Sequence, residues 1–161
     1  MAEKMPTAPR VLVLTGSSSD LPEIQKMVPL LERFGLSHRI EVASAHRQPQ
    51  KVHRLLEEAE RGGTEVFIAA AGMAAHLPGV VASLTDKPVI GVPLASGPLA
   101  GFDALLSIVQ MPPGIPVATV AVGGAGARNA AVLAARILAL KDPQVAAALA
   151  DYRREMAEGG R

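Results

Sequence analysis

His46 and Arg47 are neighbouring residues whose types suit proton transfer and anion binding. They lie between an alternating apolar stretch, residues 38–43, and a helical pattern, residues 50–61. An imidazole can both accept and donate a proton near neutral pH, and a guanidinium offers a permanent charge with donors that suit phosphate. The pair predicts an enzyme that acts on a phosphorylated small molecule. The alternatives are a histidine bonded to a loop carbonyl and an arginine in a surface ion pair.

A second candidate segment is GSSSD, residues 16–20, which follows an apolar run and precedes a helical pattern. Glycine allows a tight turn there, and free backbone donors gather at such a turn. The hydroxyls of Ser17 and Ser19 suit a phosphate or a sugar, whereas Asp20 would repel phosphate and suits a ribose hydroxyl. The alternative is an ordinary helix cap in a serine-rich turn.

Two further segments end apolar runs and could form walls of a site, residues 69–79 and 91–97. Small side chains in the first would let the backbone approach a ligand closely. His76 is either a polar wall group or a histidine that bonds backbone at a helix start. No histidines lie at metal-ligand spacing, so we expect no metal. We interpret the glycine-rich residues 123–127 as a packing turn rather than a dinucleotide loop.

Short apolar runs alternate with helical patterns, which predicts an α/β fold with a parallel sheet and helices on both faces. Such sheets bind ligands outside the carboxyl ends of their strands, so the four segments should meet there. We expect a flexible N-terminus over 1–9, an α/β catalytic domain over 10–141 and a C-terminal helix of the same domain over 142–161, capped by Asp142. The predicted strands are 10–15, 38–43, 65–71, 88–92 and 117–122. The predicted helices are 21–34, 50–61, 77–84, 102–110 and 127–140, and Pro29 should kink the first of them near Gln25.

Composition narrows the class of protein. The 161 residues are 49% hydrophobic and 2% aromatic, with a net charge of +1 and no cysteine. The small net charge gives no reason to expect nucleic acid or an anionic membrane as a partner. No basic run is interleaved with aromatics, which argues further against nucleic-acid binding. Two uncharged stretches, 66–85 and 104–127, are long enough for a membrane span, but glycines and prolines interrupt both. We interpret them as buried strands and crossovers, with surplus apolar surface for a homo-oligomer.

The series GSSSD, SAHR, AGMAAHLPG, GVP, SIVQMPPGIPVAT and GAGARNAAVLAA resembles the PurE family of purine biosynthesis over residues 10–140. The resemblance implies a flavodoxin-like three-layer αβα sandwich with a five-stranded parallel sheet and an extra C-terminal helix, assembled as a cytoplasmic octamer. Its AAHLPG and SIVQMP segments resemble the class that converts N5-carboxyaminoimidazole ribonucleotide to 4-carboxy-5-aminoimidazole ribonucleotide. That isomerisation implies no cofactor.

The resemblance also assigns roles by position. It implies that Ser17, Asp20 and Arg47 bind the nucleotide and that His46 transfers the proton. The residues that it places around the site and the reacting carboxylate are Ser44, Ala45, Gly72, Ala74, Ala75, His76 and Leu77. Four positions depart from the usual family pattern: Met73 for glycine, Ala95 for a polar residue, Ala104 for serine and Gly124 for a basic residue.

Two other functions remain open. The first is direct carboxylation of aminoimidazole ribonucleotide with carbon dioxide, the activity of the family's other class. The second is a non-catalytic flavodoxin-like binding domain or receiver. A receiver needs an acidic cluster after the first strand and an aspartate after the third, where this chain has Asp20 alone and Gly72. A flavin site favours aromatic stackers, and the chain has one tyrosine and no tryptophan.

Overall fold

The structure is a computed structural model that describes residues 8–159. The predicted flexible N-terminus, residues 1–9, therefore lies outside the described residues except for its last two. Among the described residues, no helix has both the length and the apolar character that crossing a bilayer requires.

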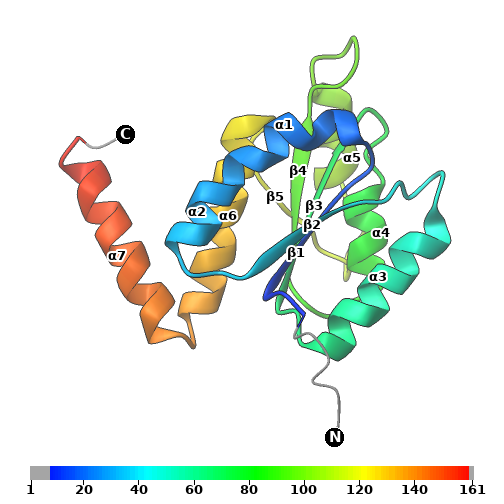
Figure 1. Cartoon of the computed structure of the whole chain (residues 1–161). Coiled ribbons are helices and arrows are strands. Elements are labelled where there is room, and N and C mark those ends of the chain that lie inside the picture. The colour runs from blue at the N-terminus through cyan, green and yellow to red at the C-terminus, as the bar shows by residue number, and fades with distance from the viewer. Residues whose placement is uncertain (1–7, 160–161) are drawn as a thin grey trace, which may run out of the picture.

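A five-stranded sheet with parallel pairing forms the middle of the molecule, in the order β2-β1-β3-β4-β5 (Figure 1). This is the flavodoxin order, in which the chain changes its direction of sheet building between β1 and β3. The predicted fold class is confirmed. The strands are β1 Val11–Thr15, β2 His38–Val42, β3 Val66–Gly72, β4 Val89–Leu94 and β5 Ala118–Thr119.

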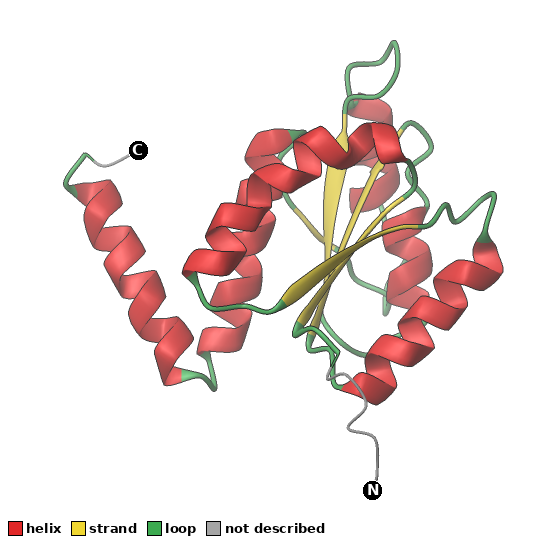
Figure 2. Ribbon diagram, in the orientation of Figure 1, coloured by secondary structure: helices red, strands yellow, loops and turns green. Residues whose placement is uncertain are grey.

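Helices cover both faces of the sheet and complete the three layers (Figure 2). One face packs against α1, α2 and α6, and the other against α3, α4 and α5. The helices are α1 Leu21–Ile24, α2 Val28–Arg33, α3 Pro49–Gly62, α4 Leu77–Ser83, α5 Phe102–Val109, α6 Gly124–Ala139 and α7 Pro143–Ala157, and two short 3-10 turns are η1 Ser18–Asp20 and η2 Gln25–Met27.

The core follows from the alternation of side chains along buried strands. Val11 and Val13 pack on the α6 side, and Leu12 and Leu14 pack on the α3 side, all with no exposed surface. Strands that are covered on both faces need apolar residues at every position, which is why β1, β3 and β4 read as continuous apolar runs.

Two predicted elements differ from the observed ones. The predicted strand 117–122 is regular only over Ala118–Thr119, although the Val120 amide still donates to the Gly91 carbonyl. The helix predicted from 127 begins at Gly124, because the glycine-rich turn supplies its first residues. A side chain at Gly126 would overlap the Ala121 carbonyl, so this turn brings α6 close to the segment that follows β5.

The kink that Pro29 predicts is confirmed. The helical segment divides into α1 and α2 around η2, Gln25–Met27. Pro29 therefore lies in the first turn of α2, where its missing amide needs no partner. The division gives a structural reason for this proline.

The helix α7 extends the α6 side of the molecule and lies away from the sheet (Figure 1). Asp142 is its N-cap, as predicted, and accepts from the amides of Gln144 and Val145. Val145 and Leu149 are buried against the core on this side, and Tyr152 packs edge-on against Phe34 with ring centroids 5.5 Å apart.

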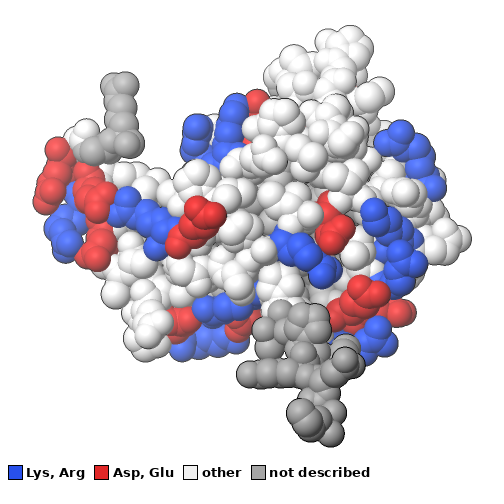
Figure 3. All heavy atoms as spheres, in the orientation of Figure 1, with Lys and Arg blue, Asp and Glu red and all other residues white. Residues whose placement is uncertain are grey.

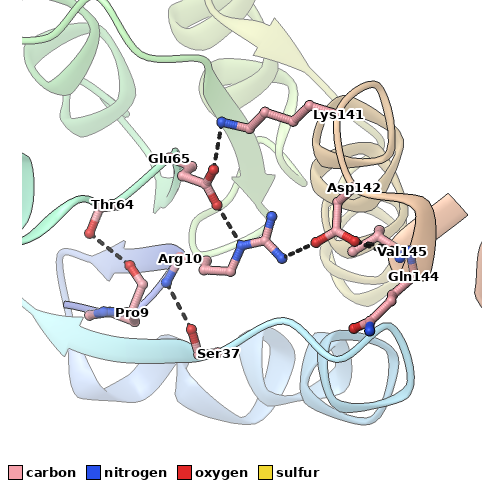
Figure 4. A network of polar contacts seen from close by, with 9 residues as sticks. All are labelled: Pro9, Arg10, Ser37, Thr64, Glu65, Lys141, Asp142, Gln144 and Val145. Carbon is pink, nitrogen blue, oxygen red and sulfur yellow. Dashed lines mark hydrogen bonds and ion pairs between the residues drawn. The ribbon is translucent and has the colours of Figure 1, made fainter. Parts of the chain in front are cut away.

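A polar network fastens the start of α7 to the amino ends of β1 and β3 (Figure 4). Arg10 pairs with Glu65 and, at 2.7 Å, with Asp142, while Lys141 pairs with Glu65 at 2.7 Å. Burial raises the pKa of Glu65, but hydrogen bonds from Lys141 and Arg10 outweigh it and hold that pKa below its ordinary value. The network lies at the edge of the sheet opposite the carboxyl ends of the strands.

Candidate active site

A cavity of about 540 Å³ lies at the carboxyl ends of the central strands. Its lining comes from the turns after β1, β2, β3 and β4, with the change of building direction between β1 and β3 at its centre. Open α/β sheets bind ligands at this place because the turns on either side diverge and leave a crevice. The lining residues are Gly16, Ser17, Ser19, Asp20, Ser44, Ala45, His46, Arg47, Ala71, Gly72, Met73, Ala74, His76, Leu77 and Ser96.

The cavity brings together every residue predicted for the site except Ala75. The Ala75 side chain is 1% exposed and packs in the core beside Leu77. The turn from β3 to α4 therefore sends Ala74 and His76 toward the cavity and Ala75 away from it. Ser96 belongs to the predicted fourth wall, but sequence reasoning did not single it out.

His46 and His76 form a direct pair across the cavity. His46 Nε2 and His76 Nδ1 are 2.6 Å apart, and the rings meet edge to face at 73° with centroids 4.7 Å apart. Such a contact needs one N–H and one lone pair, so one ring donates while the other accepts. Within residues 8–159 neither predicted alternative is realised: His46 does not bond a loop carbonyl, and His76 makes no side-chain cap at α4.

Arg47 links two turns of the cavity wall. Its guanidinium donates to the Gly16 carbonyl at 3.1 Å and to Ser44 Oγ at 3.4 Å, and its backbone amide donates to the same hydroxyl oxygen at 3.2 Å. Within the described part of the chain Arg47 forms no ion pair, so the surface ion-pair alternative is wrong. The guanidinium keeps donors available for an anion in the cavity.

The turn after β1 places two hydroxyls and a carboxylate on the cavity wall. Ser17 Oγ accepts from the Ser19 amide at 3.3 Å and lies 2.8 Å from Ser19 Oγ. The predicted capping role of this serine-rich turn is therefore realised at Ser17. Asp20 does not cap α1 with its side chain; it accepts a hydrogen bond from Thr15 instead.

Small residues bring the β3 and β4 turns into close contact. A Cβ at Gly72 would lie 2.5 Å from Ser96 Cβ and 3.2 Å from the Leu94 carbonyl oxygen, so only glycine fits without movement. Met73 follows with φ of 55° and a side chain that is 55% exposed. A φ in the left-handed region is unusual for a residue with a long side chain. Glycine, which is common at this position in the family pattern, adopts that conformation readily.

Two of the other departures from the family pattern have a structural setting. Ala104 is fully buried in the core on the α5 side. Lys26 fills the space beside Gly124, since a Cβ there would lie 2.5 Å from Lys26 Cδ and 2.9 Å from Lys26 Nζ. A cation from η2 thus lies beside the position where relatives commonly carry a basic side chain. The exposed Ala95 has no contact that explains it.

The cavity thus combines two histidines in hydrogen-bond contact, a guanidinium, hydroxyl groups and a carboxylate. Over residues 8–159, no three histidine, aspartate or glutamate side chains are grouped as metal ligands would be. The chemistry that the arrangement supports is acid–base catalysis on a small polar molecule with an anionic group.

Comparison with known proteins decides the family. A family model described as AIR carboxylase matches residues 10–159, nearly the whole chain. The chain belongs to this family. The match confirms the predicted membership in the PurE family, because a solved PurE from Treponema denticola superposes with a TM-score of 0.85, at 34% identity and with 92% of each chain covered.

Relatives with an assigned activity are closer in sequence than that structure. The N5-carboxyaminoimidazole ribonucleotide mutase of Pyrococcus abyssi is 53% identical, covering 92% of this chain and 84% of its own. The mutase of the same name from Escherichia coli K12 is 50% identical, covering 90% of this chain and 86% of its own.

Proposed function

We propose that the protein is an N5-carboxyaminoimidazole ribonucleotide mutase of purine biosynthesis. The observation that carries the proposal is the cavity itself, where His46 and Arg47 from the turn after β2 lie with His76 from the turn after β3. The names of relatives at 50–53% identity support the same activity. The reaction is an isomerisation that moves a carboxyl group from the exocyclic nitrogen to C4 of the imidazole, and it requires no cofactor.

Substrate binding follows from the charge of the wall residues. Arg47 and the hydroxyls of Ser17 and Ser19 bind the phosphate, since together they present a cation and O–H donors. Asp20 accepts from a ribose hydroxyl, which a carboxylate favours over an anionic phosphate. Ser44 fixes Arg47 through the contacts of its hydroxyl oxygen with the Arg47 amide and guanidinium.

The chemical steps need one group that gives and takes a proton. A proton from His46 to the exocyclic nitrogen breaks the N–CO₂ bond and releases carbon dioxide. C4 of the freed aminoimidazole attacks the carbon dioxide and forms the new C–C bond. Neutral His46 then removes the C4 proton, which restores the aromatic ring and leaves His46 protonated for the next turnover. His76 holds the His46 ring and exchanges a proton with it across their 2.6 Å contact.

Carbon dioxide must be retained between bond cleavage and attack. Gly72 and Ala74 line the cavity with small side chains, and Leu77 adds an apolar wall. Both histidines are nevertheless exposed in the single chain. A surface from outside this chain must therefore cover the cavity, because retention of a small neutral molecule depends on exclusion of water.

A homo-oligomer, which we propose to be an octamer in the cytoplasm, supplies that surface. Leu99, Phe102, Leu106 and Val109 are 59%, 70%, 58% and 46% exposed around α5. The upper part of the molecule in Figure 3, where the β4–α5 loop lies, carries almost no charged side chains. An exposed apolar surface of this kind marks a contact between proteins.

Direct carboxylation is the second candidate, because the matching family is described as AIR carboxylase. Purified protein separates the two when it is given either N5-carboxyaminoimidazole ribonucleotide or aminoimidazole ribonucleotide with bicarbonate, and the product is quantified by chromatography. We expect rapid conversion of the first substrate in buffer free of bicarbonate, and its loss in His46→Asn. Product from the second substrate alone would overturn the mutase proposal.

A further inference from the structure

Thr15 carries a hydroxyl at a position of β1 where packing requires only an aliphatic side chain. It ends a strand whose first four residues are valine and leucine, and it is fully buried. Valine has nearly the same shape and needs no hydrogen-bond partner, so a buried hydroxyl stabilises nothing unless it is bonded. The Thr15 hydroxyl donates to Asp20 Oδ2 at 2.9 Å, which satisfies this requirement.

The side chain of Asp20 does not cap the helix α1 that follows it. It stands at the N-cap position of α1, yet its side chain accepts no hydrogen bond from that helix. Among residues 8–159, no lysine, arginine or histidine forms an ion pair with it. Thr15 is the protein donor that its carboxylate has in this part of the chain, and the bond is made to Oδ2. The residue lines the cavity, so Oδ1 remains for a ligand.

We propose that Thr15 is a positioning residue, which holds Asp20 Oδ2 so that Oδ1 faces the ribose hydroxyls of the substrate. The inference rests on the proposed function, in which Asp20 contacts the ribose. A buried donor restricts the carboxylate to one orientation before the substrate arrives, and a group that is already ordered loses less entropy on binding. The ribose does not react, so its contact is equally strong in the ground state and the transition state.

The test compares Thr15→Val with Thr15→Ser. Valine keeps the buried shape and removes the hydroxyl, and we expect it to raise KM roughly three- to tenfold, with kcat changed by less than about twofold. Serine keeps the donor and should return KM to within about twofold of the wild type. Thermal unfolding of each variant reports whether the fold is retained.

Thr64→Val is the matched control. Thr64 is also a buried threonine, 1% exposed, and its hydroxyl donates to the Pro9 carbonyl at 2.8 Å, at the opposite end of the sheet. This variant loses a buried hydrogen bond without touching the cavity. Its KM should remain that of the wild type, so a rise in KM here would show that the effect of Thr15→Val is a general loss of stability.

A double-mutant cycle separates positioning from other effects. In an Asp20→Ala background, Thr15→Val should change KM by less than about twofold, because the carboxylate through which it acts is gone. An unchanged KM in Thr15→Val, or the same increase in both backgrounds, would overturn the inference. Absence of mutase turnover in the wild type would instead reject the proposed function, and the affinity of the same variants for aminoimidazole ribonucleotide by calorimetry would still test Thr15.

Discussion

Gly72→Ala offers a test of how the cavity is built, because the structure specifies what a methyl group would meet. The added Cβ would lie 2.5 Å from Ser96 Cβ, overlap Ser96 Oγ and lie 3.2 Å from the Leu94 carbonyl oxygen. Ser96 must move by about 1 Å to restore ordinary contact, and the direction open to it is the cavity. Overpacking of this kind lowers the free energy of unfolding by about 1–3 kcal/mol.

Urea unfolding and steady-state kinetics measure the two consequences of this substitution. In a chain of this length the loss corresponds to a fall in Tm of roughly 2–12 °C, measured by thermal unfolding. KM should rise because the displaced Ser96 occupies substrate volume. The backbone of Gly72 is outside the left-handed region, so strain in φ does not confuse the result.

Ser96→Gly is the compensating change. Alone it costs up to about 1 kcal/mol, since glycine gains freedom in the unfolded chain. Combined with Gly72→Ala it removes the atoms that the methyl group would strike, so the double variant should recover most of the stability and of KM. The cycle should give a coupling of about 1–2 kcal/mol. If the losses of stability in the two single variants simply add, or if Gly72→Ala alone is as stable as the wild type, the proposed contact between Gly72 and Ser96 is refuted.

Three further perturbations have definite expected outcomes. His76→Asn should lower kcat by about 10²-fold, as loss of an acid–base partner does. Its Tm should stay near the wild-type value because the ring is exposed. A kcat equal to that of the wild type would show that His76 takes no part in the proton transfer of His46. Met73→Gly should raise the free energy of unfolding by about 1 kcal/mol in urea titrations, since it relieves the left-handed φ. Glu65→Gln should lower the free energy of unfolding at neutral pH. In the wild type the ionised carboxylate contributes this stabilisation above its ordinary pKa of 4.5 and loses it as the pH falls through the lower pKa of the folded state. If the free energies of unfolding of the two proteins stay parallel from pH 7 to pH 3, this prediction is contradicted.

Much of the fold was accessible from local patterns. Continuous apolar runs identified β1, β3 and β4, because strands covered on both faces expose no position to water. Asp142 and Pro143 marked the start of α7, and Pro29 marked the break in the first helical segment. Parallel strands share one carboxyl edge, so the segments after them were expected to meet, and they do.

Single side chains were harder to place. The direction in which Ala75 points depends on the turn between β3 and α4, whose backbone no periodicity describes. The last strand was predicted too long, because an apolar run does not show where the ladder with β4 stops. Thr15 ends the predicted strand 10–15, and nothing in the local pattern identifies Asp20 as the acceptor for its hydroxyl.

The sequence by itself determined the kinds of element, the edge of the sheet where the site lies and the residues that could do its chemistry. Only the tertiary structure decided that His46 meets His76, that Ser96 covers Gly72 and that Thr15 holds Asp20. The physical reason is that periodicity records how each residue is buried relative to its near neighbours along the chain. Contacts between separate turns depend on strand order and register, which are set by how all the elements pack together.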